Sequence, residues 1–197
     1  KLNLVNENQA HLTPKIGVDN PDLRQFLRFQ LQPNFTAVVE IDHRGSTLCV
    51  GATSTLAIRV TELINMPINL VVPIPHLPPA VMGVYNWRGE ILWVVDLGIL
   101  LGLTDCITTH HRNLQPTIAI SSAATTGSEA KTIGLVVDEI SDIEWYQPEL
   151  IVKPITDSSN PELYRWIKGY VVSAVGEKLA ILDVQAIIEN ADLHAEI

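Results

Sequence analysis

Histidine and cysteine side chains are the groups of this sequence that could hold a metal ion. Cys106 lies close to the adjacent pair His110 and His111. Neighbouring histidines point in different directions in a helix or a strand, whereas a zinc site needs three or four ligands around one centre. The remaining histidines form no HExxH pair. We therefore predict no metal ligands and no cofactor.

Two pairs of carboxylates could act as general acid and base: Asp138 with Glu139, and Glu62 with Glu90. Such catalysis needs a desolvated pocket that shifts a pKa, and no pattern in the sequence indicates one. The sequence also lacks a GxSxG elbow, a Walker A loop and a GxGxxG turn. We expect no catalytic residues and no enzyme. A small ligand- or metal-binding β-barrel enzyme is the alternative.

The charge balance indicates which partners the chain can have. Its 197 residues include 13 Lys and Arg against 22 Asp and Glu, a net charge of −9. Nucleic-acid binding needs a basic face, so we expect no nucleic-acid partner. Charged residues make up 18% of the chain, against about 25% in ordinary domains. A surface poor in charge favours a protein that binds other proteins. Two cysteines without a CxxC motif favour a reducing, cytoplasmic location.

The stretch from residue 63 to 87 resembles a membrane span because it has no Asp, Glu, Lys or Arg. It contains five prolines, at positions 67, 73, 75, 78 and 79. Each proline removes a backbone donor and disfavours helix at the residue before it. We therefore predict an extended connector and no direct insertion into a membrane.

The elements that must position these residues are mostly strands. Runs rich in Val, Ile and Thr predict β-structure at 27–31, 36–41, 47–50, 55–64, 91–95, 117–120, 132–137, 170–175 and 178–182. Two short helices are predicted after Asp96 and Asp183, because each aspartate can cap the helix that the following apolar residues form. The fold class is mainly β.

A tandem repeat relates the two halves of the chain. Residues 83–101 (GVYNWRGEILWVVDLGILL) correspond to 169–188 (GYVVSAVGEKLAILDVQAII), with Gly83 matching Gly169 and Asp96 matching Asp183. Upstream, residues 60–63 resemble residues 137–140. Gly89 falls in the tight turn of the first hairpin, where a positive φ is needed. We predict structural roles for Gly83, Gly89, Asp96, Gly169 and Asp183.

Residues 72–103 resemble the signature of CheW-like domains, the chemotaxis coupling proteins, which show the pattern P..P....G..N.RG...P..DL...LG. Residues 133–145 and 167–188 resemble further segments of the same family, so the resemblance spans about residues 24–191. It implies two tandem five-stranded SH3-like β-barrels packed side by side. Residues 1–22 would be a flexible lead-in, 23–192 one domain, and 193–197 a tail. We place the two barrels at roughly 36–112 and 113–192, the second with the N-terminal strand.

The resemblance also implies a function. The family comprises non-enzymatic adaptors that couple methyl-accepting taxis receptors to the regulatory domain of a CheA-type histidine kinase, in receptor arrays at the membrane. Receptor-binding positions of the family fall on Val60, Glu62, Asn86 and Arg88. Arg88 could instead pair with Glu62 or Glu90 to hold the hairpin, and pairing in the free protein is compatible with both roles. A CheW-like regulatory fragment of a larger kinase is a further alternative.

Two departures from the family pattern stand out. Trp93 occupies a position where the family usually has Pro, and residues 36–51 are longer than usual, which predicts an extra hairpin closed at Arg44 and Gly45. The sequence of residues 83–98 is similar to that of CheW-like proteins from cyanobacterial phototaxis systems. That similarity predicts control of type IV pilus motility.

Overall fold

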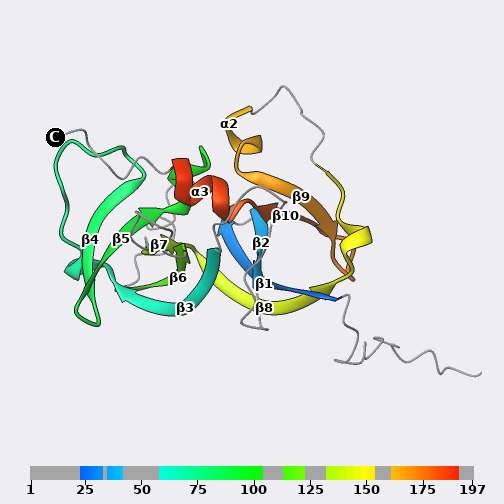
Figure 1. The fold of residues 1–197 in the computed structure, drawn as a ribbon, viewed down its shortest axis with the longest axis horizontal. Helices are drawn as coiled ribbons and strands as arrows, with labels where there is room; N and C mark the ends of the chain where they lie inside the picture. The colour runs from blue at the N-terminus through cyan, green and yellow to red at the C-terminus, as the bar shows by residue number, and fades with distance from the viewer. Residues whose placement is uncertain are drawn as a thin grey trace, which may run out of the picture.

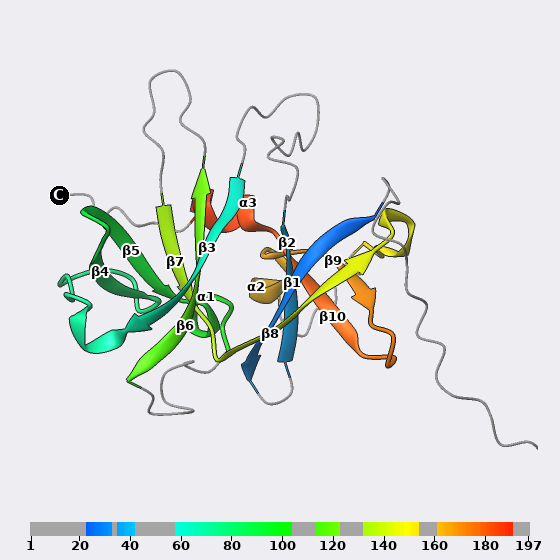
Figure 2. The ribbon, with the colours of Figure 1, turned by 90° about the horizontal axis from the view of Figure 1, so that it is seen from below.

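The chain folds into two mostly antiparallel five-stranded sheets, which curl into neighbouring barrels (Figures 1 and 2). The computed structural model describes residues 23–32, 35–41, 58–103, 113–122, 132–153 and 161–190. The first barrel has the strand order β3 (Ile58–Pro67), β6 (Leu114–Ser122), β7 (Thr132–Val136), β5 (Glu90–Asp96) and β4 (Val81–Trp87). The second has the order β8 (Glu139–Tyr146), β1 (Arg24–Gln32), β2 (Phe35–Ile41), β10 (Lys178–Leu182) and β9 (Ile167–Val172). The mainly β prediction is confirmed.

The division of the chain between the barrels differs from the boundary expected at residues 112 and 113. Strands β6 and β7 complete the first barrel, although they lie beyond residue 112. Strand β2 belongs to the second barrel, where it pairs with β1 and runs parallel to β10. The second barrel therefore combines the N-terminal strand pair with β8, β9 and β10. In this barrel β1 and β2 occupy the positions that β6 and β7 occupy in the first.

The two barrels repeat each other element by element. The first strand in the order of each sheet contains a β-bulge. Thr61 in β3 and Ser141 in β8 are the bulged residues, because each is skipped in the pairing with the neighbouring strand. A 3-10 turn follows in both, η1 (Ile68–Leu70) and η2 (Pro148–Leu150). A short bridge then closes each barrel, Val72 to Val84 and Val152 to Tyr170. The bulges, the 3-10 turns and the first bridge residues share an offset of 80 residues, so Glu62 corresponds to Asp142. The sequence match of residues 60–63 to 137–140 is therefore shifted by three residues.

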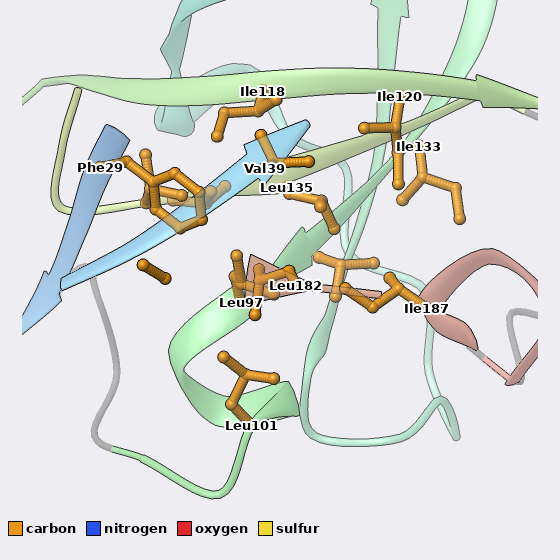
Figure 3. Packing of buried hydrophobic residues seen from close by; sticks show 14 of the residues in the cluster. Phe29, Val39, Leu97, Leu101, Ile118, Ile120, Ile133, Leu135, Leu182 and Ile187 are labelled. Carbon is orange, nitrogen blue, oxygen red and sulfur yellow. The ribbon is translucent and has the colours of Figure 1, made fainter. Parts of the chain in front are cut away.

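One hydrophobic core joins the barrels. Ile118, Ile120, Ile133 and Leu135 from the first barrel pack against Val39 and Leu182 from the second (Figure 3). Helix α3 (Val184–Asn190) lies between the barrels and adds Ile187, while α1 (Leu97–Leu100) adds Leu97 and approaches β1 (Figures 1 and 3). A smaller cluster around Phe26 and Tyr146 lies in the second barrel, and α2 (Pro161–Tyr164) precedes β9.

Individual element predictions had mixed outcomes. Both aspartate-capped helices are present: Asp96 accepts a hydrogen bond from the Ile99 N–H at 3.0 Å, and Asp183 from the Ala186 N–H at 3.1 Å. The strand predicted at 170–175 ends at Val172, because residues 173–177 form the hairpin turn. Strand β8 had not been predicted as a separate strand. The strand predicted at 47–50 and the hairpin at Arg44 lie outside the described residues.

Candidate functional site

The candidate site is the tip of the β4–β5 hairpin. Trp87 and Glu90 pair across the hairpin and leave a two-residue turn of Arg88 and Gly89. Both turn residues have positive φ, 54° at Arg88 and 87° at Gly89, which is the pattern of a type I′ turn. Asn or Gly normally occupies the first of these positions, since a left-handed conformation costs other residues about 1–2 kcal/mol. Arg88 is therefore held in a conformation that arginine does not favour.

The Arg88 side chain contacts two neighbours. Its Nη2 donates a hydrogen bond to Oε1 of Glu62 on β3 at 2.6 Å, and its Cζ lies 5.0 Å from the centre of the Trp87 ring. The side chain is still 68% exposed, and that of Glu62 is 34% exposed. An ion pair this open to water contributes about 0–1 kcal/mol to stability. The structure thus brings Glu62 and Arg88 together as an accessible pair. This pairing is compatible with a receptor-binding role of Arg88 and with a role in holding the hairpin.

Asn86 and Val60 complete the predicted receptor-binding set. The Asn86 side-chain oxygen accepts a hydrogen bond from the Gly89 N–H at 3.0 Å, so Asn86 is exposed but also shapes the turn. Val60 lies in β3 opposite Ile120, next to the bulge, and its side chain lies outside the described residues. Receptor binding by these four residues stays a prediction.

Gly83 and Gly169 occupy equivalent positions in β4 and β9, beside the bridges that close the barrels. A Cβ on Gly83, whose φ is 142°, would lie 2.7 Å from the carbonyl carbon of Val72 and 2.9 Å from the Cα of Pro73. A Cβ on Gly169 would lie 2.9 Å from the Ile151 Cγ2 and 3.0 Å from the Val152 oxygen. The backbone approach is closer at Gly83. A Cβ on Gly89 would meet nothing within 4 Å, so its positive φ alone requires glycine there.

The second barrel has a polar cluster that sequence reasoning missed. Arg28 on β1 forms ion pairs with Glu144, at 2.8 Å, and with Glu177 at the β9–β10 hairpin. Tyr146 donates a hydrogen bond to the other oxygen of Glu144. The hydrogen bond to Glu144 raises the pKa of Arg28, while burial and the same carboxylate raise the pKa of Tyr146. No sequence signal joins these residues, because they come from three distant segments.

The neighbouring carboxylates Asp138 and Glu139 differ in their exposure to water. Asp138 is buried at 2% exposure and its N–H donates to the Gln30 oxygen at 3.0 Å, whereas Glu139 is exposed. Within the described ranges, no group of three or more His, Cys, Asp or Glu side chains could hold a metal ion. Cys106, His110 and His111 lie outside the described residues. Among the described segments, no helix is both long enough and apolar enough to span a membrane.

Several large apolar side chains are exposed on the first barrel. Leu70, Val72 and Ile74 lie along the connector between β3 and β4, and Ile91 is 71% exposed at the start of β5. Val84 and Trp93, which are partly buried, connect the bridge residue Val72 to β5. Among the side chains described in this barrel, Glu62, Arg88 and Glu90 are the exposed or half-exposed charges. By strand pairing and alternation, Val72, Val84, Trp93 and Ile91 share one face of this sheet, and Trp87 lies on the other.

Comparison with known proteins agrees with this architecture. A family model described as the CheW-like domain matches residues 52–192. The chain is 24% identical over 123 residues to the chemotaxis protein CheW of Rhizobium meliloti (strain 1021), covering 62% of this chain and 72% of that protein. It is 26% identical over 121 residues to the probable chemotaxis protein CheW of Rhizobium etli, covering 61% and 71%.

A solved structure shares the fold. The crystal structure of the scaffolding protein TtCheW from Thermoanaerobacter tengcongensis superposes with a TM-score of 0.60 at 17% identity, covering 85% of this chain and 89% of that one. The two curled five-stranded sheets of this chain have equivalent strand arrangements, and together they define a tandem SH3-like β-barrel protein. The family match extends over more than half of the residues. The chain belongs to the CheW-like domain family, whose members are scaffold proteins of chemotaxis signal transduction.

Proposed function

We propose that this chain is a non-enzymatic adaptor that couples methyl-accepting taxis receptors to the regulatory domain of a CheA-type histidine kinase. It would act in the cytoplasm, associated with receptor arrays at the membrane, and would require no cofactor. Family membership supports this role. The names of the two Rhizobium proteins support a setting in chemotaxis.

The observation that carries the proposal is the conformation of Arg88. An arginine at the first position of a type I′ turn costs about 1–2 kcal/mol of backbone strain. Its exposed ion pair with Glu62 contributes about 0–1 kcal/mol and its ring contact with Trp87 about 0.5–1 kcal/mol, which together only offset that strain. Asparagine would fit the turn better, so stability alone does not account for arginine here. Residues held in unfavourable backbone conformations often serve a function, and an exposed guanidinium is suited to binding a partner's acceptor groups.

The surroundings of Arg88 also suit a protein partner. Protein interfaces are enriched in arginine and aromatic residues and combine an apolar centre with polar groups. Here Trp87 lies under the guanidinium, on the face of the sheet that also carries Glu62. These contacts support docking of a receptor helix at the hairpin tip, with Glu62 and Arg88 supplying the charged contacts.

The experiment is calorimetric titration of the purified chain with a receptor signalling fragment and, separately, with a kinase regulatory domain. The test variant is Arg88→Asn, which keeps a residue that tolerates the left-handed turn. We expect at least about tenfold weaker receptor binding, the usual loss for an arginine at the centre of an interface. The free energy of unfolding should change by less than about 1 kcal/mol, because relief of strain offsets the lost pair and ring contact.

The matched control is Arg165→Gln in the second barrel. Arg165 also lies over a tryptophan ring, with its Cζ 4.4 Å from the centre of Trp166, so this control removes a similar contact elsewhere. Receptor binding should not change. Equal receptor affinity of wild type and Arg88→Asn would show that Arg88 is not a receptor contact. Absence of binding to either the receptor fragment or the kinase domain would refute the adaptor role. Control of type IV pili stays a prediction from the sequence.

A further inference from the structure

The contact between Arg88 and Trp87 is unusual for residues that follow one another at a strand end. Adjacent residues in a regular strand point to opposite faces of the sheet. Trp87 is the last residue of β4, and Arg88 has already entered the turn with a φ of 54°. The left-handed backbone therefore allows the Arg88 side chain to lie over the preceding ring, at 5.0 Å from its centre.

Trp87 and Glu62 lie on the same face of the sheet. Residues two apart in a strand share a face, and paired residues on neighbouring strands share it too. Trp87 shares its face with Tyr85, two residues earlier in β4. From Tyr85 the same face continues through paired residues across β5, β7 and β6 to Glu62 on β3, by way of Leu92, Val94, Gly134 and Ala119. The Trp87 ring and the Glu62 carboxylate thus reach the guanidinium from the same side of the barrel wall, which fixes the position of a group at the end of a long, exposed side chain.

We propose that Trp87 is a positioning residue that orders the Arg88 guanidinium for its partner. An exposed arginine otherwise loses considerable side-chain rotamer freedom when it binds a partner. Stacking on Trp87, together with one hydrogen bond to Glu62, restricts that freedom before binding and leaves further N–H donors for the partner. This inference rests on the proposed function, because the positioned group is the proposed receptor contact.

The second barrel offers an arginine with different surroundings for comparison. Arg28 is 21% exposed and bonds two carboxylates, whereas Arg88 is 68% exposed and bonds one. The position equivalent to Trp87 is Ser173, whose hydroxyl accepts a hydrogen bond from the Glu177 N–H at 3.1 Å and so shapes the turn. The turn at 173–177 contains no arginine, and in this second hairpin the cation over a ring is Lys178, whose Nζ lies 3.9 Å from the centre of the Tyr170 ring.

The test combines Trp87→Leu, which removes the aromatic face, with Trp87→Phe, which keeps one. Each is titrated with the receptor signalling fragment, alone and in an Arg88→Gln background. The ring-current shift of the Arg88 δ-protons is measured by NMR in the free proteins. Trp145→Leu, at a partly buried tryptophan of the second barrel, controls for loss of an indole, and thermal unfolding checks that every variant is folded.

We expect Trp87→Leu to weaken receptor binding about two- to fivefold and to abolish the proton shift, while Trp87→Phe retains most of both. In the Arg88→Gln background, Trp87→Leu should cause no further loss. An equal loss in that background would show that Trp87 contacts the partner directly, and unchanged binding would show that it contributes nothing; either result overturns the inference. If the wild type binds no receptor fragment, the proposed function fails, and absence of the ring-current shift would independently overturn the ordering of Arg88.

Discussion

Replacing Gly83 by alanine should open the first barrel. Gly83 lies in β4 beside the bridge in which Val72 and Val84 exchange two backbone hydrogen bonds, of 2.8 and 2.9 Å. An added Cβ would collide with the Val72 carbonyl group and approach the Cα of Pro73 to 2.9 Å, and backbone atoms cannot rotate away as a side chain can. The connector before β4 must therefore move, and the bridge must lengthen or break.

The magnitude follows from two contributions. Loss of the two hydrogen bonds costs about 1 kcal/mol each, and a φ of 142° costs a residue with a side chain about 1–3 kcal/mol. Gly83→Ala should therefore lower the free energy of unfolding by about 3–5 kcal/mol, a large part of the 5–15 kcal/mol typical of a domain. Urea unfolding, followed by tryptophan fluorescence and circular dichroism, measures this change.

Gly169→Ala is the matched control in the second barrel. Its nearest contact would be the Ile151 side chain at 2.9 Å, which can shift, and the residue has no left-handed φ. We expect a loss of about 1–2 kcal/mol, as for modest overpacking. Because one core joins the barrels, both variants should unfold in a single transition. A Gly83→Ala variant as stable as wild type, or more stable than Gly169→Ala, would refute the close backbone approach at Gly83.

Three further predictions concern stability. Gln115→Met should raise the free energy of unfolding by about 1–2 kcal/mol, because neither side-chain amide atom of this fully buried residue has a hydrogen-bond partner in the described part of the chain. Urea unfolding measures this change, and a lower free energy of unfolding would contradict the prediction. Asp96→Ala and Asp183→Ala should each cost about 1 kcal/mol through loss of a helix cap, measured by thermal unfolding, with Asp183→Asn as a variant that keeps the cap. The pKa of Tyr146 is raised in the folded state, so folding favours its protonated form. The stability that results is complete below pH 10 and declines above it. The free energy of unfolding of Tyr146→Phe should therefore decline less steeply than that of wild type between pH 10 and 11.5.

The sequence predicted those features that depend on neighbouring residues. The turn at Gly89 and the helices after Asp96 and Asp183 are set by one or two residues acting on their own backbone, so local patterns were sufficient. The repeat of these signals indicated two similar modules, and the tandem barrels confirm it. The same patterns brought Glu62 and Arg88 into one candidate site, through a resemblance that extends over most of the chain.

Only the tertiary structure decided how strands far apart in the chain combine. The local pattern of β2 does not indicate that it pairs with β10 instead of the next strands along the chain, because parallel pairing and barrel closure depend on long-range contacts. The bulges at Thr61 and Ser141 and the cluster around Arg28 have the same origin. The left-handed backbone that lays Arg88 on Trp87 was likewise hidden, since the sequence places adjacent residues on opposite faces and only the turn geometry reverses that.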